Sequence, residues 1–181
     1  MEYVPLAIPG VVLIKPKVFG DERGFFMGTF RQSDFAQHCG HYHFVLDNHS
    51  KSAHGILRGL RYQLRQPQGK LVRVTRGEVF DVAVDLRQSS PIFGQWVGEF
   101  LSEENKHQLW VPPGFTHGFL VTSLEAEFFY KCTDNYAPDD EYGLIWNDSD
   151  IAIDWPELAN RPILSGKHQQ AASFADCAQF S

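Results

Sequence analysis

The clearest pattern along the chain is a strict alternation of apolar and polar side chains over residues 78–87. Successive side chains of a β-strand point to opposite faces, so a period of two predicts a strand with one apolar face. The two sets are Phe80, Val82, Val84 and Leu86 on one face, and Asp81, Asp85 and Arg87 on the other.

Two further segments have strand-like patterns. Residues 70–80 predict two short strands joined at Arg76-Gly77, because glycine readily adopts the backbone angles of a tight turn. Residues 125–132 alternate as strictly as the first segment, with Ala126, Phe128, Tyr130 and Cys132 opposing Glu125, Glu127 and Lys131.

Helical patterns are few. Residues 31–40 predict one short helix with Ser33 as its N-cap and Gly40 as its stop, and residues 165–177 favour a helix only weakly. The 15 glycines and 10 prolines are spread along the chain and separate short segments. Many short strands with few helices predict an all-β fold. We expect a single domain over residues 1–181, an antiparallel jelly-roll β-barrel with a few short helices.

Composition limits the classes of function. Hydrophobic residues make up 43% of the chain and aromatic residues 14%, which is typical of a globular protein. The formal net charge of -6 argues against general binding to nucleic acid or to a membrane surface, since both require a basic face. The three cysteines are too few and too widely spaced for a disulfide framework. No signal peptide or membrane span is recognisable, so we expect a cytoplasmic protein.

One segment of this acidic chain is unusually basic. Residues 54–74, "HGILRGLRYQLRQPQGKLVRV", carry four arginines and one lysine within a strand-like pattern. A local pocket for a phosphorylated small molecule is consistent with this segment. Arg58 and Arg61 are three residues apart, so in a regular strand they face opposite sides. If both reach one pocket, the strand must be irregular near Gly59, and we predict such an irregularity.

The segment "PPGFTHGF", residues 112–119, resembles the second cupin motif, with Pro112, Gly114 and His117 in the motif positions. In metal cupins the histidine joins an upstream H-x-H pair and a glutamate. Here the corresponding strand offers Arg61 and Gln63, and the chain's H-x-H at residues 41–43 comes too early. A metal ion beside arginines is electrostatically unfavourable, so we predict no metal site and no cofactor.

Several segments together resemble the dTDP-4-dehydrorhamnose 3,5-epimerases, a family of cupin-fold nucleotide-sugar enzymes. The matching segments run from about residue 8 to residue 168, and include "VFGDERGFF", "DNHSKS", "GILRGL-YQ", "QGKLVRV--GEVFDVAVD", "QLWVPPGF-HGF", "AEFFYK" and "IWND". The resemblance implies a dTDP-sugar ligand, a pocket inside the barrel, and a homodimer whose subunits exchange N-terminal strands.

The resemblance also implies a role for individual residues. Lys70 would approach the C4 carbonyl oxygen of the sugar, and Tyr130 would donate a proton. Arg23 and Arg58 would hold the pyrophosphate, since guanidinium groups match phosphate oxygens bidentately. The remaining substrate contacts would come from Phe19 and Tyr136 at the thymidine, from Asp47, Asn48 and Glu141 at the nucleotide and sugar, and from His117 in the sugar pocket. Lys167 would also contact the substrate.

The chain departs from the family pattern at its catalytic base. The family reads R-G-L-H-Y-Q, with histidine as the base, where this chain reads "RGLRYQ" with Arg61. The aspartate that orients the histidine lies in S-x-K-D, where this chain has "SGKH" with His168. Gly28 and Leu46 also replace a family glutamate and glutamine. Arginine stays protonated near neutral pH and cannot act as a general base.

Three interpretations of this change remain open at the level of sequence. His168 could act as the base beside Arg61, whose charge would keep the imidazole neutral. The pocket could carry out a different or partial reaction, for example on one carbon. It could also bind the nucleotide sugar without catalysis. Independently of the family, Arg58 could simply pair with a carboxylate such as Asp81 or Asp85.

Overall fold

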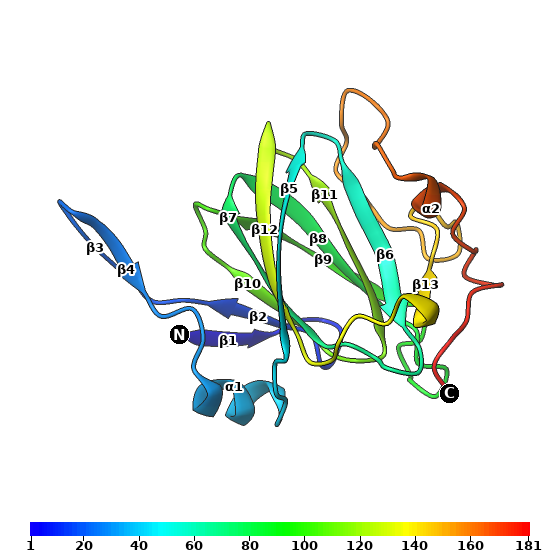
Figure 1. Ribbon diagram of the computed structural model, residues 1–181, viewed down its shortest axis with the longest axis horizontal. Helices are drawn as coiled ribbons and strands as arrows, with labels where there is room; N and C mark the ends of the chain where they lie inside the picture. Colours follow the sequence, from blue (N-terminus) through cyan, green and yellow to red (C-terminus); the bar gives the residue numbers. More distant parts are fainter.

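The computed structural model describes all residues, 1–181, and consists of two antiparallel sheets that face each other as a barrel (Figure 1). The prediction of an all-β jelly-roll barrel of the cupin type is confirmed. One sheet has the strand order β1-β2-β10-β7-β12-β5. Its strands are β1 (Glu2–Pro5), β2 (Val12–Lys15), β10 (Gln108–Val111), β7 (Lys70–Arg76), β12 (Glu125–Cys132) and β5 (Leu46–Ala53).

The second sheet has the order β13-β6-β11-β8-β9. Its outer face is covered by the C-terminal segment, which carries the short helix α2 (Gly166–Gln169) (Figure 1). The strands are β13 (Glu141–Gly143), β6 (Leu57–Gln63), β11 (Phe115–Val121), β8 (Glu78–Asp85) and β9 (Trp96–Ser102), with a 3-10 turn at Pro138–Asp140 before β13.

A two-stranded arm stands apart from the barrel. Strands β3 (Val18–Asp21) and β4 (Gly24–Met27) pair only with each other and project away from both sheets (Figure 1). Its aromatic side chains remain exposed, with Phe25 61% and Phe26 74% accessible. The arm therefore presents an exposed aromatic surface.

The predicted alternation in residues 78–87 is correct, but the apolar face does not point into the barrel. Phe80, Val82 and Val84 pack outward against the C-terminal segment. The opposite face of β8 points inward and carries Asp81, which is completely buried. Apolar side chains therefore pack against both faces of β8, and the charged Asp81 lies in the barrel interior.

The other local predictions were partly correct. Helix α1 (Gln32–Cys39) ends at Gly40 as expected, but its N-cap is Arg31, so Ser33 lies inside the helix. The chain does turn sharply at Arg76-Gly77, where Gly77 has φ of 73°, yet the two strands belong to different sheets and form no hairpin. In the tail, only four residues are helical.

Strand β6 is irregular at the predicted place. The pairing of β11 with β6 shifts register between His117 and Phe119, opposite Arg61 and Arg58. Gly59 has φ of 122°, in the region that favours glycine, and the Gly59–Leu60 peptide bond is cis. As a result Arg58 and Arg61 line the same cavity.

Candidate functional site

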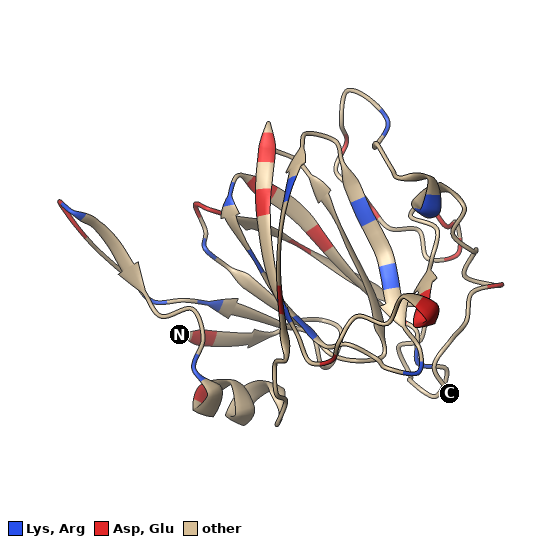
Figure 2. Ribbon diagram, in the orientation of Figure 1, with Lys and Arg blue, Asp and Glu red and all other residues tan.

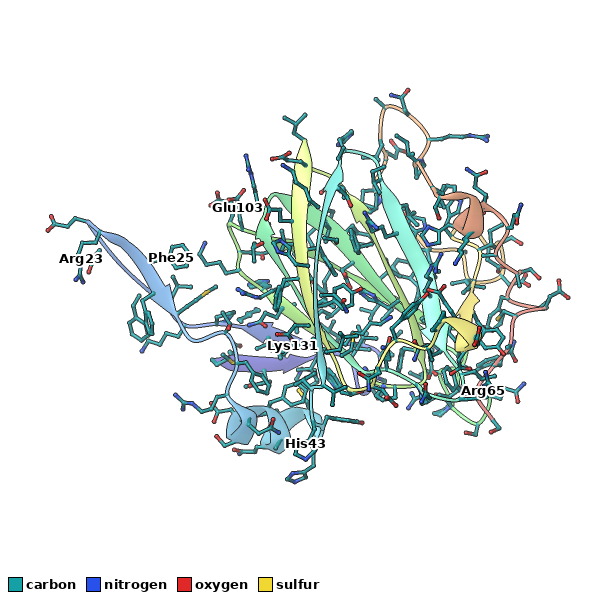
Figure 3. The ribbon with its side chains drawn as sticks, viewed as in Figure 1. Arg23, Phe25, His43, Arg65, Glu103 and Lys131 are labelled. Atoms are coloured by element: carbon teal, nitrogen blue, oxygen red, sulfur yellow. The ribbon has the colours of Figure 1, made fainter.

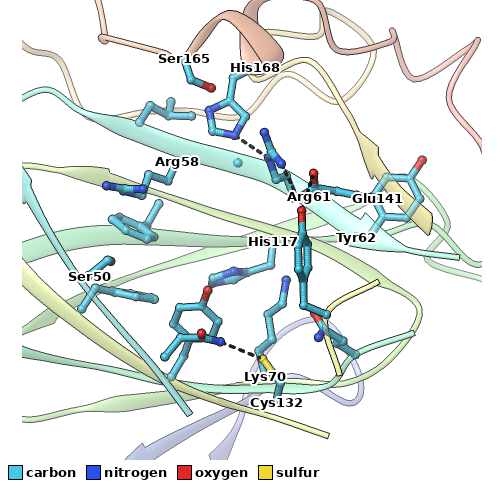
Figure 4. Close-up of a pocket in the computed structure, with 18 of the residues that line it drawn as sticks. Ser50, Arg58, Arg61, Tyr62, Lys70, His117, Cys132, Glu141, Ser165 and His168 are labelled. Carbon is cyan, nitrogen blue, oxygen red and sulfur yellow. Dashed lines mark hydrogen bonds and ion pairs between the residues drawn. The ribbon is translucent and has the colours of Figure 1, made fainter. Parts of the chain in front are cut away.

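A cavity of about 820 Å³ opens between the two sheets at the end covered by α2. Strands β5, β6, β7, β11 and β12 supply most of its walls, and the tail supplies the rest. The side chains that line it are half apolar and half polar (Figure 4). The polar ones include Asn48, Ser50, Arg58, Arg61, Gln63, Gln68, Lys70, His117, Tyr130, Tyr136, Glu141, Ser165 and His168.

The Arg58 guanidinium lines the cavity and is not paired with a carboxylate. Its Nε donates a hydrogen bond to Ser52 Oγ at 2.8 Å, and it forms no ion pair. The two basic positions of β6 are visible along that strand in Figure 2. The guanidinium is therefore oriented by a neutral hydroxyl and keeps its charge available for an anion.

Arg61 is held differently, between two partners. One nitrogen of its guanidinium forms an ion pair with Glu141 Oε1, and its Nε donates to His168 Nε2 at 2.6 Å (Figure 4). The tail thus does bring His168 to the position that the sequence predicted. Burial and the Arg61 charge lower the pKa of His168 to about 4.

This geometry does not support His168 as the base. A neutral imidazole has one nitrogen with a lone pair and one with a proton. Because Nε2 accepts from Arg61, the lone pair is engaged and the proton lies on Nδ1, which is buried without a partner. His168 therefore neutralises no charge and accepts no further proton while this contact persists.

Lys70 and Tyr130 project into the same cavity from β7 and β12. Burial lowers the pKa of Lys70, and the charge of Arg61 lowers it further, while Asp81 and Glu141 act in the opposite direction. Burial raises the pKa of Tyr130, which keeps its hydroxyl protonated. The cavity therefore offers an amine and a phenolic proton donor, both without ion-pair partners.

His117 lies on β11 and is backed by a buried carboxylate. Its Nε2 lies 2.9 Å and 3.0 Å from the two carboxylate oxygens of Asp81. His117 is 8% exposed and Asp81 is fully buried. The alternative in which Asp81 or Asp85 pairs with Arg58 is wrong, because Asp81 binds His117 and Asp85 binds Arg87.

The cavity rim carries two more predicted residues. Tyr136 donates to Glu141 Oε2 at 3.3 Å, so the carboxylate that holds Arg61 also holds the tyrosine. Asn48 lies on the cavity side of β5 beside Cys132.

No group of three His, Cys, Asp or Glu side chains is arranged so that it could hold a metal ion. No helix is long and apolar enough to cross a membrane.

Four predicted residues lie outside this cavity. Arg23 and Phe19 are on the arm, far from the barrel interior, where Arg23 pairs with Asp21 (Figure 3). Asp47 points to the outer face of β5 and binds Lys131 Nζ at 3.0 Å. Lys167 is 77% exposed and lies 3.9 Å from Glu141.

Comparison with known proteins identifies the family. The sequence model of the dTDP-4-dehydrorhamnose 3,5-epimerases matches residues 5–176. A dTDP-4-dehydrorhamnose 3,5-epimerase of Pseudomonas aeruginosa is 60% identical over 177 residues, which cover 97% of each chain. The chain belongs to the dTDP-4-dehydrorhamnose 3,5-epimerase family.

Solved structures of relatives share the architecture. An epimerase of Legionella pneumophila, in complex with dTDP-4-keto-L-rhamnose, has a TM-score of 0.94 and 49% identity over 97% of this chain and 93% of its own. A 3'-monoepimerase of Streptomyces bikiniensis, in complex with dTDP-quinovose, has a TM-score of 0.88 and 31% identity over 95% and 87%. Both structures contain dTDP-sugar ligands.

Within the family frame, sequence reasoning missed two residues that orient others. Ser52 positions Arg58, and its signal is its even spacing from Asn48 on β5, which puts both side chains on the cavity side. Asp81 positions His117. Its signal is an acidic residue in the middle of the strand, between Phe80 and Val82, although the sequence does not say which partner it meets.

Proposed function

We propose that this protein is a nucleotide-sugar epimerase that acts on a dTDP-4-keto-6-deoxyhexose. The observation that carries the proposal is the convergence of Arg58, Lys70 and Tyr130 on one cavity. Those three groups suit a pyrophosphate, a carbonyl oxygen and a protonation step respectively. Membership of a family of isomerases supports the same reaction class.

The reaction requires three functions at the carbons beside the ketone. A base removes a carbon-bound proton, a cation stabilises the resulting enolate oxygen, and an acid returns a proton to the opposite face. In this proposal the Lys70 ammonium faces the enolate oxygen and the Tyr130 hydroxyl donates the proton. Arg61 is a permanent cation, so it adds to the positive potential around the developing negative charge and takes no part as a base.

The nucleotide half of the ligand completes the site from two chains. We assign the pyrophosphate to Arg58 and Arg23, and the thymidine to Tyr136 and Phe19. Because Arg23 and Phe19 lie on the projecting arm, they reach a cavity only if a second copy receives the arm. The functional unit in this proposal is a homodimer. Asn48, Glu141, Asp47 and Lys167 would then complete the contacts around the nucleotide and sugar.

A second candidate function is nucleotide-sugar binding without epimerisation, or reaction at one carbon alone. The specific observation in its favour is Arg61, which occupies the family's base position and is tied to Glu141 and His168. Removing an acid–base group typically lowers a rate by about 10²–10⁴-fold, so the loss of one base is enough to change the outcome.

Solvent exchange separates these functions. The protein is incubated with dTDP-4-keto-6-deoxyglucose in deuterated water, and label at C3 and C5 is followed by NMR, while calorimetry measures binding of dTDP. We expect label at one or both carbons, and at least about 100-fold slower labelling in Lys70→Gln. Tight binding without label supports the second candidate, and no binding of dTDP rejects both.

A further inference from the structure

His117 and Asp81 form a pair that the assignments above leave without a chemical role. Asp81 is fully buried on β8, and both of its carboxylate oxygens lie within hydrogen-bond distance of His117 Nε2. Nε2–H therefore donates to the carboxylate, which leaves the lone pair on Nδ1. The side-chain hydrogen bonds of His117 go to Asp81 alone, and His117 lines the cavity together with Lys70 (Figure 4).

The position of His117 in the sheet is informative. His117 on β11 is the cross-strand partner of Arg61 on β6. Side chains of directly opposed residues share a face, with their Cβ atoms about 5 Å apart. An imidazole therefore stands one strand away from the place where the family keeps its base, and a buried carboxylate orients it.

The His117–Asp81 pair lies among other charged and titratable groups. Burial raises the pKa of Asp81, although His117 and Lys70 partly counteract that effect. The other titratable or charged groups that line the cavity are Arg58 and Arg61 from β6, Lys70 from β7, Tyr130 and Cys132 from β12, Tyr136 from the loop before β13, Glu141 from β13 and His168 from α2.

We propose that His117, oriented by Asp81, is the general base that replaces the missing histidine at position 61. This inference rests on the proposed epimerase function and names the residue that starts its reaction. His117 is the catalytic residue in this proposal, because it lines the cavity and its Nε2 is already bound, and Asp81 is a positioning residue that acts through it.

The step is balanced without any co-reactant. His117 Nδ1 takes the proton from the carbon beside the ketone, and the C–H electrons form the carbon–carbon double bond of the enolate. The carbonyl electrons move to the oxygen that Lys70 faces. Tyr130 then gives its proton to the other face of the same carbon as the carbonyl re-forms. The imidazolium loses its proton to solvent and the tyrosinate regains one, so the net change is an isomerisation.

The test uses His117→Asn and His117→Gln in the deuterium exchange assay. We expect labelling of the 4-keto sugar nucleotide to fall by at least about 100-fold in both variants, with dTDP affinity changed by less than about threefold. The matched control is His43→Gln, because His43 is exposed beside α1 and far from the cavity (Figure 3). Thermal unfolding and dTDP binding identify a variant that has not folded, and the second substitution then replaces it.

Asp81→Asn tests the positioning role. Without the carboxylate the imidazolium form is less stable, so the acidic limb of the pH–rate profile should move to lower pH while the rate falls by at least about tenfold. A purely structural role for Asp81 would lower thermal stability without moving that limb. An unmoved limb overturns the assignment of Asp81.

The outcomes also separate this inference from the function on which it rests. Exchange that continues undiminished in both His117 variants overturns the base assignment alone and leaves the epimerase intact. A wild-type protein that binds dTDP but incorporates no label overturns both. Loss of exchange in the His117 variants with intact dTDP binding supports both.

Discussion

At the scale of single residues, the central feature is that Arg61 and His168 remain in contact although both differ from the family pattern. Their hydrogen bond of 2.6 Å joins a permanent cation to a neutral imidazole, and Glu141 balances the charge of the arginine. The contact therefore places a fixed positive charge on β6 and a neutral acceptor on the tail.

The low pKa of His168 predicts a pH-dependent stability. An unfolded histidine takes up a proton near pH 6.5, whereas His168 in the folded protein does so only near 4. The unfolded state therefore binds more protons between these values, and stability falls as pH decreases from 6.5 to 4. In His168→Asn we expect the decrease in melting temperature over this range to be smaller by a few degrees (~2–4 °C). An unchanged pH dependence would contradict the assigned environment.

A second residue-scale prediction concerns the family's own base. The double variant Arg61→His/His168→Asp restores the family's residue pair at positions that already touch. We expect its rate of epimerisation to exceed that of the wild type by at least about tenfold, because it adds an oriented proton acceptor. Product analysis by NMR measures this rate, with Arg76→His, which is exposed and pairs with Glu125, as the control. No gain would mean that other changes in the cavity also limit the reaction.

At the scale of elements, strand β6 decides which side chains reach the cavity. Its irregular backbone brings Arg58 and Arg61 to the same face, and close contact with β11 requires glycine. A Cβ atom at Gly59 would lie 2.5 Å from Gly118 Cα and 2.7 Å from the His117 carbonyl oxygen. Both contacts involve backbone atoms, so no rotation of a side chain relieves them.

We therefore expect Gly59→Ala to destabilise the fold by about 2 kcal/mol or more and to weaken dTDP binding, because the two strands must separate. Chemical denaturation and calorimetry measure the two effects. Gly28→Ala is the control, since a Cβ atom there meets nothing within 4 Å. A Gly59→Ala protein with wild-type stability would show that the strands can shift without cost.

The strands also show which features of the fold the sequence can predict. Period-two patterns located β8 and β12 correctly, because the alternation follows from the geometry of any strand. The pattern does not state which face meets the barrel interior, since a C-terminal segment that begins near Leu144, far along the chain from β8, can cover an apolar outer face. Nor does the pattern state which side chain on the neighbouring strand meets Asp81, so the alternative that paired it with Arg58 was wrong. The irregularity in β6 was predictable because two arginines of opposite parity had to share one pocket.

The sequence likewise predicts the positions of some site residues but not of others. Residues on barrel strands, such as Lys70 and Tyr130, reach the cavity as family position implied. His168 also arrives, but its hydrogen-bond partner fixes a tautomer that local sequence cannot specify. Arg23 and Phe19 lie on an arm outside the barrel and would reach a cavity only in the proposed dimer, so neither pattern nor single-chain geometry places them.

At the scale of the whole molecule, the position of the arm predicts that a residue outside the barrel affects ligand binding. In the proposed dimer Arg23 of each copy serves the cavity of the other, although it is 85% exposed here. We expect Arg23→Ala to weaken dTDP binding by about 10-fold or more with little change in stability. Arg31→Ala is the matched control, because the Arg31 side chain is also exposed and forms an ion pair only with Asp34. Equal affinities in both variants would contradict delivery of the arm to a partner.

The dimer itself has a simple test. Phe25 and Phe26 expose large apolar surfaces on the arm, and their replacement by serine should shift the protein toward monomer by at least about tenfold in dissociation constant. Light scattering across a concentration series measures this shift. The control is Leu124→Ser, since Leu124 is 87% exposed on the barrel and lies outside the arm. A wild-type protein that stays monomeric would contradict the dimer.

The C-terminal segment covers part of the hydrophobic core and also forms part of the cavity wall. Its buried residues Leu144, Ile151 and Cys177 seal the outer face of the second sheet, and Ile163, Leu164 and His168 form a wall of the cavity. Backbone hydrogen bonds tie Ile163 to Gly55 and Leu57 beside β6. Local unfolding of this segment would therefore open the cavity and expose the core together. A bound ligand should therefore slow amide hydrogen exchange throughout the tail. This protection should extend to tail residues that do not contact the ligand.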